Sequence, residues 1–406
     1  MNDASRISRR LSLCMVLEAI VHCAPISRAS IAKQTGLSKQ TISDIARQLE
    51  EEGWIRETGR TSGHVGRTAL TYEIVPDKAV IAAVDLGGTK VRAAIADLSC
   101  RVLADVSEPT DKRGGLSTVQ QIARLCRKAA ALEGVDFAKV QLAVVGVPGA
   151  PEASTGRVLM APNIPNWENM DVAAALEEEL GVPAVVENDV NLAVRGEHWI
   201  GAGAECDDLV LIALGTGIGG GVMVRGELVR GASNAAGELG FLPFGSDAFD
   251  PRSLHTGALE RSLGSSGICE RYREHSGETR DVDVRDIFEA AATGDKAAVV
   301  TLDETARLLA RTVVAVAAIT NPAKIILGGS IGVRPEMVER VRKLMPLCFP
   351  RQVCVEPSEL GPKAALIGAA AIGLASLHAT LFTRGVQGAS IALPPAEVLR
   401  SREAAA

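Results

Sequence analysis

A strand, a glycine turn and a second strand follow one another twice in this chain, and this repeated unit limits the possible folds most. In the first unit, the apolar run 79–84 leads into the turn 85–90 (Asp-Leu-Gly-Gly-Thr-Lys), and a second strand-like run, 91–97, follows. In the second unit, the run 209–214 leads into residues 215–221, five of which are glycine. Glycine lets backbone N–H groups approach an anion closely, so each turn is a candidate phosphate site.

A third glycine turn, 327–332, follows the short apolar run 324–327. The three turns together resemble the two-lobed fold of actin and hexokinase, in which each lobe begins with a phosphate loop and nucleotide lies between the lobes. The resemblance implies an α/β body with this actin-like, sugar-kinase (ribonuclease H-like) ATPase fold. A chain of 406 residues with 47% apolar and 23% charged residues has the length and composition of a globular protein with two or three domains.

Charge, cysteine spacing and hydropathy restrict the partners. No run approaches the ~20 apolar residues of a membrane-spanning helix, so we expect no membrane contact. The eight cysteines contain no Cys-x-x-Cys pair, and isolated thiols fit a reducing cytoplasm. Residues 1–78 hold 11 Lys and Arg against 9 Asp and Glu, whereas the rest of the chain is net acidic. Local DNA contact by the N-terminal segment is therefore possible, but coating of nucleic acid by the whole chain is not expected.

The first 75 residues have the pattern of a winged helix-turn-helix. A helical apolar stripe over 11–22 ends at Pro25, Ser27 is placed to cap a short second helix, and Gly36 closes that helix. Ser38 is a second N-cap, and the third helix is expected over 39–52. A helix, a glycine-containing turn and a capped helix together predict a DNA-binding motif, with operator DNA as partner.

Polar side chains at the start of the third helix and arginines in the following hairpin are the candidate DNA contacts. The start of a recognition helix enters the major groove, and arginines on a flexible wing can enter a narrow minor groove. The residues are Lys39, Gln40, Thr41, Ser43 and Arg47 on the helix, and Arg60 and Arg67 on the wing. The alternative is a three-helix module that binds another protein.

Several polar residues between the glycine turns are candidates for binding a polyol. Asp189 follows the strand 184–186 and is flanked by asparagines, so it is a plausible general base for a sugar hydroxyl. The candidate sugar ligands are Asn163, Asn188, Asp189, Glu238 and Glu260. Four of the five have a simpler alternative: a helix N-cap for Asn188 and Asp189, and a turn for Asn163 and Glu238.

Five segments together resemble the ROK family of repressors, open reading frames and sugar kinases. They are 85–90, Pro162-Asn163, 187–191, 215–221 and 237–240. The winged helix places the chain with the regulator branch of that family. The resemblance spans nearly the whole chain and implies a sugar ligand, a homodimer or homotetramer, and a sugar contact at Glu260.

The resemblance also implies a domain plan. The winged helix takes residues 1–75, the sugar-kinase-like body 79–380, and a loose tail 381–406. Within the body, lobe 1 is expected at about 79–195 together with the helix 362–379, and lobe 2 at about 196–361. If ATP binding is retained, its phosphates fall to the turns, at Asp85, Gly87, Gly88, Thr89, Lys90, Gly215, Thr216, Gly217, Gly328 and Gly329.

Two readings of the function follow. The first is a sugar-responsive transcriptional regulator of the repressor type, in which the body binds a sugar and the winged helix binds the operator. The second is an ATP-dependent sugar kinase or a bifunctional kinase-regulator, with Asp189 as catalytic base, Asp85 positioning magnesium and Mg-ATP as cofactor. A weaker third reading is an interaction protein whose body only dimerises and whose glycine turns are relics of the fold.

The chain departs from the family at the expected zinc site. Family members have a histidine after the Gly-Glu-x-Gly element and a cysteine-rich loop, but this chain has Phe241, Pro251, Ser253 and Ala258 at those positions. A tetrahedral zinc site needs four nitrogen or sulfur ligands, which His255 alone cannot supply. We therefore predict that elemental analysis of protein purified without chelator finds no stoichiometric zinc. One zinc per chain that survives dialysis would contradict this prediction.

Overall fold

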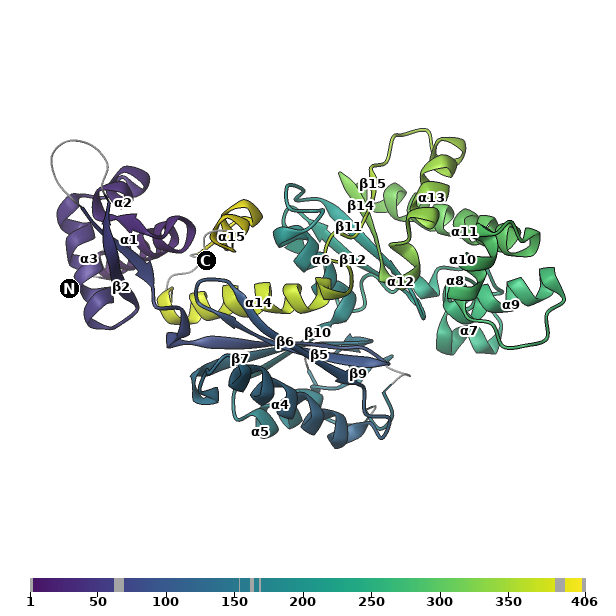
Figure 1. Cartoon of the computed structure of the whole chain (residues 1–406), viewed down its shortest axis with the longest axis horizontal. Helices are drawn as coiled ribbons and strands as arrows, with labels where there is room; N and C mark the ends of the chain where they lie inside the picture. Colours follow the sequence, from purple (N-terminus) through teal and green to yellow (C-terminus); the bar gives the residue numbers. More distant parts are fainter. Residues whose placement is uncertain are drawn as a thin grey trace.

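A computed structural model describes residues 3–61, 69–152, 154–160, 164–167, 169–383 and 391–403. It places a small winged helix-turn-helix beside a two-lobed body, with the long helix α14 (Ala364–Phe382) reaching from one to the other (Figure 1). The predicted fold class is therefore confirmed.

The helices of the winged helix begin and end at the capping residues that the sequence predicts. Ser27 accepts a hydrogen bond from Ser30 N, Ser38 accepts one from Thr41 N, and Gly36 ends the second helix in the left-handed conformation. The first helix is longer than predicted, because it begins at Asp3 rather than near residue 11. The elements are α1 (Asp3–Cys23), β1 (Ile26–Ser27), α2 (Arg28–Thr35), α3 (Lys39–Glu51), β2 (Ile55–Thr61) and β3 (Ala69–Ile74).

The first lobe is a five-stranded sheet of order β10-β7-β4-β5-β6. Its strands are β4 (Val80–Leu86), β5 (Lys90–Asp97), β6 (Val102–Pro109), β7 (Val140–Val147) and β10 (Ala184–Asn188). One face is covered by α4 (Gly115–Leu132) and α5 (Val172–Leu180), and the other by α14 (Figure 1). Both faces of β4 are thus buried, which explains its continuous apolar run.

The second lobe repeats the plan with a sheet of order β13-β12-β11-β14-β15. Its strands are β11 (Leu209–Leu214), β12 (Ile218–Val224), β13 (Glu227–Leu228), β14 (Lys324–Gly328) and β15 (Val355–Pro357). Its helices are α7 (Pro251–Thr256), α8 (Ala258–Leu263), α9 (Ser265–Ser276), α10 (Val284–Ala292), α11 (Lys296–Thr320), α12 (Gly329–Gly332) and α13 (Pro335–Cys348). The interlobe helix α6 (Asp189–Ile200) packs on one face of the sheet, and α11 and α13 pack on the other.

The sequence predicts that the glycine run 215–221 forms one long phosphate loop, but the structure divides this run between a turn and a strand. Only Gly215–Gly217 form a turn, and Gly219, Gly220 and Gly221 lie inside β12. A Cβ on Gly221 would lie 2.6 Å from Val190 O, so the glycines let α6 lie against the strand. The predicted third turn is likewise a strand end followed by the single helical turn α12.

The winged helix and the body share one apolar core. This core joins buried residues of α1 and α3 to residues of α14 such as Leu374 and Phe382. Trp54 packs edge-on against Phe382 at 5.2 Å, and Lys78 lies over the Trp54 ring. The DNA-binding unit is therefore fastened to the body by side-chain packing as well as by its linker.

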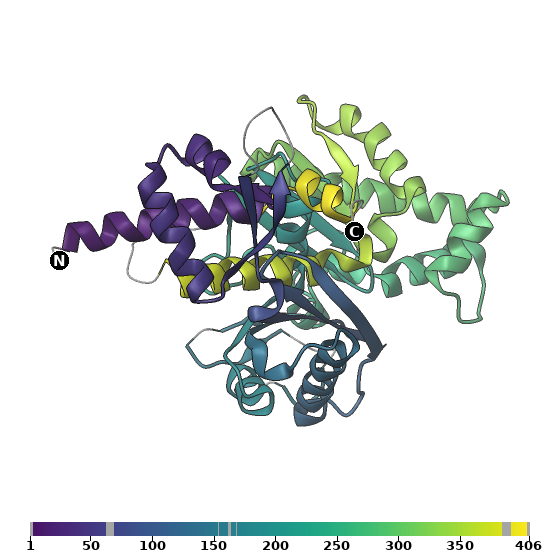
Figure 2. The ribbon, with the colours of Figure 1, turned by 60° about the vertical axis from the view of Figure 1, so that its left-hand side comes forward.

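The C-terminal segment corrects the expectation of a loose tail. Ile391 is buried, and α15 (Ala396–Glu403) lies between the winged helix and the body (Figure 2). The prediction failed because this segment is held by contacts with distant parts of the chain, which no local periodicity records.

One described helix, over Gly361–Phe382, is long and apolar enough to cross a membrane, so the expectation that no run approaches this length was wrong. Its inward side packs on the sheet of the first lobe, and more than half of its most apolar window is buried. Its composition is accounted for by its position in the core.

The crossing of α6 and α14 generates a stability prediction. A Cβ on Gly368 would overlap the carbonyl oxygen of Leu192, whereas one on Gly373 of the same helix would meet side-chain atoms only, of Ile81 at 3.1 Å and of Val144 at 3.2 Å. Gly368→Ala should lower the free energy of unfolding by about 3 kcal/mol, since backbone must move. Gly373→Ala should change the free energy of unfolding by less than about 1 kcal/mol. Alanine has a better helix propensity than glycine, and this gain offsets the small cost of moving the neighbouring side chains. Equal effects in chemical denaturation would contradict this packing.

Candidate functional site

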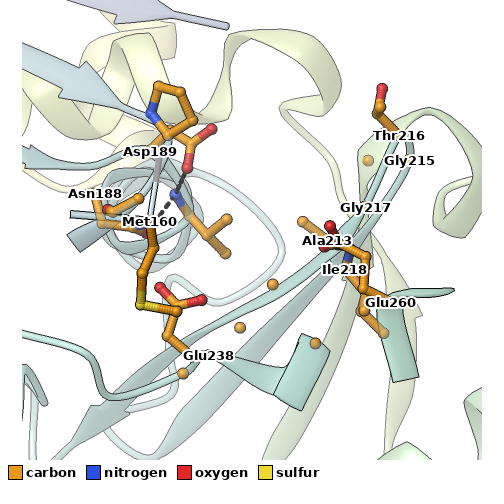
Figure 3. Close-up of a pocket in the computed structure, with 18 of the residues that line it drawn as sticks. Met160, Asn188, Asp189, Ala213, Gly215, Thr216, Gly217, Ile218, Glu238 and Glu260 are labelled. Atoms are coloured by element: carbon orange, nitrogen blue, oxygen red, sulfur yellow. Dashed lines mark hydrogen bonds between the residues drawn. The ribbon is translucent and has the colours of Figure 1, made fainter. Parts of the chain in front are cut away.

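A cavity of about 420 Å³ lies between the two lobes. Both sheets contribute to it: Asn188 and Asp189 come from the first lobe, and Gly215–Ile218, Glu238 and Glu260 from the second (Figure 3). This volume is within the range of small-molecule sites. The structure thus brings together four of the five predicted sugar ligands, and Asn163 lies outside the described residues.

Asp189 is the first residue of α6 and is placed there by the Asn188 cap. Asn188 Oδ1 accepts hydrogen bonds from the backbone N–H of Val190 and Asn191, and Asn188 Nδ2 donates to Gly149 O at 2.9 Å. The simpler alternative for Asn188, a helix N-cap, is therefore confirmed. Its amide also lines the cavity, but its polar atoms already have partners within the protein.

The pKa of the Asp189 carboxyl is well above the usual value for aspartate. Burial, and then the negative charge of Asp85, raise its pKa to about 7. Burial likewise raises the pKa of Asp85 to about 6. A carboxyl with a pKa near 7 can accept or release a proton at physiological pH, as a general base must.

Glu238 and Glu260 complete an acidic lining. Glu260 Oε2 accepts a hydrogen bond from Ile218 N at 3.1 Å, which holds this carboxylate against the second glycine turn. Burial raises the pKa of both groups, and the charge of Glu260 adds to the effect at Glu238. Figure 3 shows Asp189 and Glu238 on one side of the cavity and Glu260 on the other.

The predicted phosphate residues separate into two groups. Those that line the cavity are Gly88, Thr89, Gly215, Thr216, Gly217 and Gly329. The other four are not among the lining residues and lie at or next to the ends of β4, β5 and β14: Asp85, Gly87, Lys90 and Gly328. Gly87 N donates to Lys90 O and Gly215 N to Gly217 O, both at 2.9 Å, so each turn is closed by its own backbone.

Other lining residues were not predicted as ligands. Met160, His255, Thr256 and Phe241 line the cavity, and Phe241 is 40% exposed. The family resemblance places at position 241 a histidine that contacts both sugar and zinc, so Phe241 is expected near the ligand. By contrast, nothing local indicates that His255, on α7, lines the cavity. Within the described residues, no cluster of three His, Cys, Asp or Glu is arranged to hold a metal ion.

An ion pair ties the lobes together beside the cavity. Arg230 Nε donates to Glu187 Oε2 at 2.7 Å, and Asn191 Nδ2 donates to Glu187 Oε1 at 3.0 Å. Arg230 follows the second-lobe strand β13, whereas Glu187 lies on β10 of the first lobe. Among the described residues, Arg230 is the one cation that pairs with the buried Glu187 carboxylate, so its charge is already balanced within the protein.

The candidate DNA surface is the outer side of α3. Lys39, Gln40 and Arg47 are exposed there, whereas Thr41 and Ser43 are half-buried. Gln40 Nε2 donates to Asp44 at 3.1 Å, and Arg47 lies 3.8 Å from the same carboxylate. Asp44, which the sequence analysis did not consider, thus holds two candidate DNA contacts in place. On the wing, the Arg60 backbone belongs to β2, and Arg67 lies outside the described residues.

Comparison with known proteins identifies both parts. The sequence pattern of the ROK family matches residues 81–378, and that of a winged helix-turn-helix DNA-binding domain matches residues 14–56. A glucokinase of Halalkalibacterium halodurans is 33% identical over 264 residues, covering 61% of this chain and 79% of the relative. The xylose repressor of Caldicellulosiruptor bescii is 25% identical over 390 residues, covering 91% of this chain and 96% of the relative.

One solved structure covers both parts of the fold. A ROK family transcriptional regulator, described as a homolog of the Escherichia coli MLC protein, superposes with a TM-score of 0.71 over 90% of this chain and 96% of its own. At 24% identity this likeness bears on the fold alone.

The raised pKa of Asp189 predicts a pH-dependent stability. Between about pH 4 and pH 7 the folded chain keeps the Asp189 proton that the unfolded chain has released, so stability falls as pH rises through this window. Asp189→Asn removes this dependence. The variant should match the wild type near pH 4 and exceed its free energy of unfolding at pH 8 by on the order of 4 kcal/mol, because each unit of the raised pKa corresponds to about 1.4 kcal/mol. Parallel stability curves for the two proteins would contradict the prediction.

Proposed function

The chain belongs to the ROK family, and from that premise we propose that it is a sugar-responsive transcriptional repressor. The observation that carries the proposal is the shared core, which fastens a winged helix-turn-helix to a body with a polar cavity between its lobes. The full-length match to a xylose repressor supports the same reading. The protein acts in the cytoplasm, where its operator lies.

The body is the sensing part. Carboxylates of Asp189, Glu238 and Glu260 accept hydrogen bonds from the hydroxyl groups of a sugar, and the half-exposed ring of Phe241 offers an apolar face to its C–H groups. The two lobes meet across this cavity, so a ligand that contacts both favours a particular lobe arrangement. The ligand changes operator affinity only as far as it binds that arrangement better than the alternative.

Two copies of the chain act together on DNA. A winged helix reads one half-site, and a symmetric dimer reads two half-sites at a spacing that its own geometry fixes. A change of lobe arrangement in each copy would alter the distance between the two α3 helices. A homodimer, or a homotetramer built from it, is therefore part of the proposal.

A sugar kinase is the second candidate, and Asp189 favours it. A buried carboxyl with a pKa of about 7 beside glycine turns has the properties of a base for phosphoryl transfer. Mg-ATP, when bound, supplies the phosphoryl group; Gly88, Thr89, Thr216 and Gly217 would hold its phosphates, and Asp85 would face the magnesium. Asp189 would then take the proton from the sugar hydroxyl.

Operator binding is tested at the recognition helix. Lys39→Ala and Arg47→Ala should each weaken operator affinity about tenfold or more and reduce its salt dependence, because each removes a cation near DNA. Arg285→Ala, at an exposed position on α10 of the second lobe, is the matched control and should bind normally. Point variants are preferable to removing residues 1–75, because that deletion would uncover the shared core. Unchanged binding by both α3 variants in a fluorescence anisotropy titration would contradict the DNA surface.

Asp189→Asn separates the two candidate functions. For a sensor, the variant should weaken sugar-dependent release of operator DNA, and the wild type should hydrolyse no ATP with any hexose. For a kinase, the wild type should turn over ATP with its sugar, and the variant should be slower by roughly 10²–10⁴. A panel of sugars measured for both operator release and ATP turnover decides the matter. A panel that gives neither response would contradict both.

A further inference from the structure

The cavity between the lobes is lined by acidic groups with little positive charge to balance them, and of these Asp189, with a pKa of about 7, is only partly ionised at neutral pH. Its charged lining groups are Asp189, Glu238 and Glu260, and no lysine or arginine occurs among the described lining residues. His255 also lines it, from the exposed surface of α7. The nearby arginine, Arg230, is bound to Glu187. A ligand in this cavity therefore meets three carboxylates and no fixed cation.

The carboxylates already destabilise one another. Asp189 senses the charges of Asp85 and Glu238, and Glu238 senses that of Glu260. A phosphate ester would add about −1.5 to −2 charges at pH 7 to this group. Like charges placed together without a counter-ion disfavour a ligand, and the resulting discrimination is a common source of specificity.

The glycine turns do not offset this repulsion fully. Their backbone N–H groups are the natural donors to a phosphate, but several of them have internal acceptors. Gly87 N and Gly215 N donate within their own turns, and Ile218 N donates to the Glu260 carboxylate. The Glu260 carboxylate therefore occupies the position beside the second glycine turn where a bound anion would otherwise accept this hydrogen bond.

We propose that the ligand of this cavity is an unphosphorylated sugar, and that the cavity rejects the phosphate ester of the same sugar. The proposal rests on the sugar-sensing function and specifies its ligand. It also places the signal in a reaction sequence. The ligand must be supplied by uptake without phosphorylation or by hydrolysis of a glycoside, and the reaction that consumes it must accept an unphosphorylated sugar.

Matched pairs of ligands test this proposal with the full-length protein. Isothermal titration calorimetry would compare glucose with glucose 6-phosphate, and N-acetylglucosamine with its 6-phosphate. For any pair that binds, the free sugar should bind at least about tenfold more tightly. Glu238→Gln should narrow that ratio, because it removes one negative charge and keeps the shape of the side chain. If Glu238→Gln leaves the ratio of the affinities for free and phosphorylated sugar unchanged, charge repulsion is not the cause of the discrimination.

The outcomes also distinguish a failure of this ligand proposal from a failure of the proposed sugar-sensing function. If a phosphorylated sugar binds more tightly than its free form, the charge argument is wrong and the sugar-sensing function stands. If no free or phosphorylated sugar binds, including xylose as a pentose, the sensing function itself is wrong.

A second observation concerns the C-terminal segment 391–403, which bridges the body and the DNA-binding domain. His22 Nε2 of α1 lies 2.8 Å from Ala392 O, and Trp199 Nε1 of α6 donates to Pro394 O at 2.9 Å. Farther along, Arg400 pairs with Glu359 at 2.8 Å. Figures 1 and 2 both place α15 between the winged helix and the body. The segment therefore contacts α1 on one side and α6 on the other.

Helix α6 begins at the cavity and ends at this segment. Its first turn carries Asp189, and its last turn carries Glu197 and Trp199. Glu197 is fully buried and accepts hydrogen bonds from Ser358 Oγ and Leu360 N, next to the Arg400 partner Glu359. A continuous helix moves as a unit, so a displacement at the cavity end also displaces both anchors of the segment.

From these contacts we infer that the segment 391–403 transmits the ligand signal from α6 to α1. It acts as a positioning element, and it contacts neither sugar nor DNA. The coupling between the two binding events is a free energy that can be measured as the ratio of operator affinities without and with sugar. Loss of the segment should remove that coupling while each binding event survives.

Two kinds of variant test the transmission. Trp199→Phe removes one hydrogen-bond donor and keeps an aromatic ring, and removal of residues 391–406 removes the whole bridge. In both, sugar affinity and operator affinity should each stay within about threefold of the wild type, while the affinity ratio falls toward one. Arg400→Gln should have a smaller effect of the same sign. Arg280→Gln, which breaks an exposed Arg–Glu pair remote from the bridge, is its matched control and should keep the full ratio.

A wild-type ratio in Trp199→Phe and in the truncated chain would contradict the transmission. If the truncated chain does not fold, Trp199→Phe still decides: a retained ratio contradicts the inference, and a reduced ratio with both affinities intact supports it.

Discussion

The close crossing of α6 over α14 is the contact on which the rest of this structure depends. Gly196 and Gly368 bring the two backbones together where any side chain would overlap a carbonyl group. Through this contact, the helix that presents Asp189 to the cavity lies against the helix that reaches the winged helix. The same pair joins the lobes, because α6 also packs on the second sheet through Val194. A sensing cavity and a DNA-binding domain are thus attached to one rigid junction.

The chemistry of the cavity follows from where that junction places carboxylates. Asp189 is held at the start of α6 by the Asn188 cap, and Glu260 is held by Ile218 N on the opposite lobe. Each carboxylate is partly removed from water, and burial is the first cause of every raised pKa among them. Acceptors placed in this way suit the hydroxyl groups of a polyol. The same features also suit a general base, which explains how one fold accommodates both regulators and kinases.

The DNA-binding part is built for coupling as much as for recognition. Trp54, Lys78 and Phe382 form an interlocked contact between the wing base and the end of α14. On the opposite side, the C-terminal segment contacts α1 and α6. These contacts belong to one apolar core, and together they restrict how the winged helix can turn relative to the body. Under the proposed function, such restriction would let a small change between the lobes alter the position of the recognition helix.

Local features of this protein were readable from its sequence, and long-range ones were not. Capping serines, the turn at Gly36 and the strand–turn–strand units depend on residues close in the chain, and the structure has them where they were predicted. Four predicted sugar ligands also line one cavity, because strand ends of a known fold converge there. The glycines of β12, the place of His255 in the cavity lining, and the packing of residues 391–403 were decided only by tertiary structure. Each depends on a partner that lies far away in the chain, and the distance between such partners is set by how helices and sheets pack.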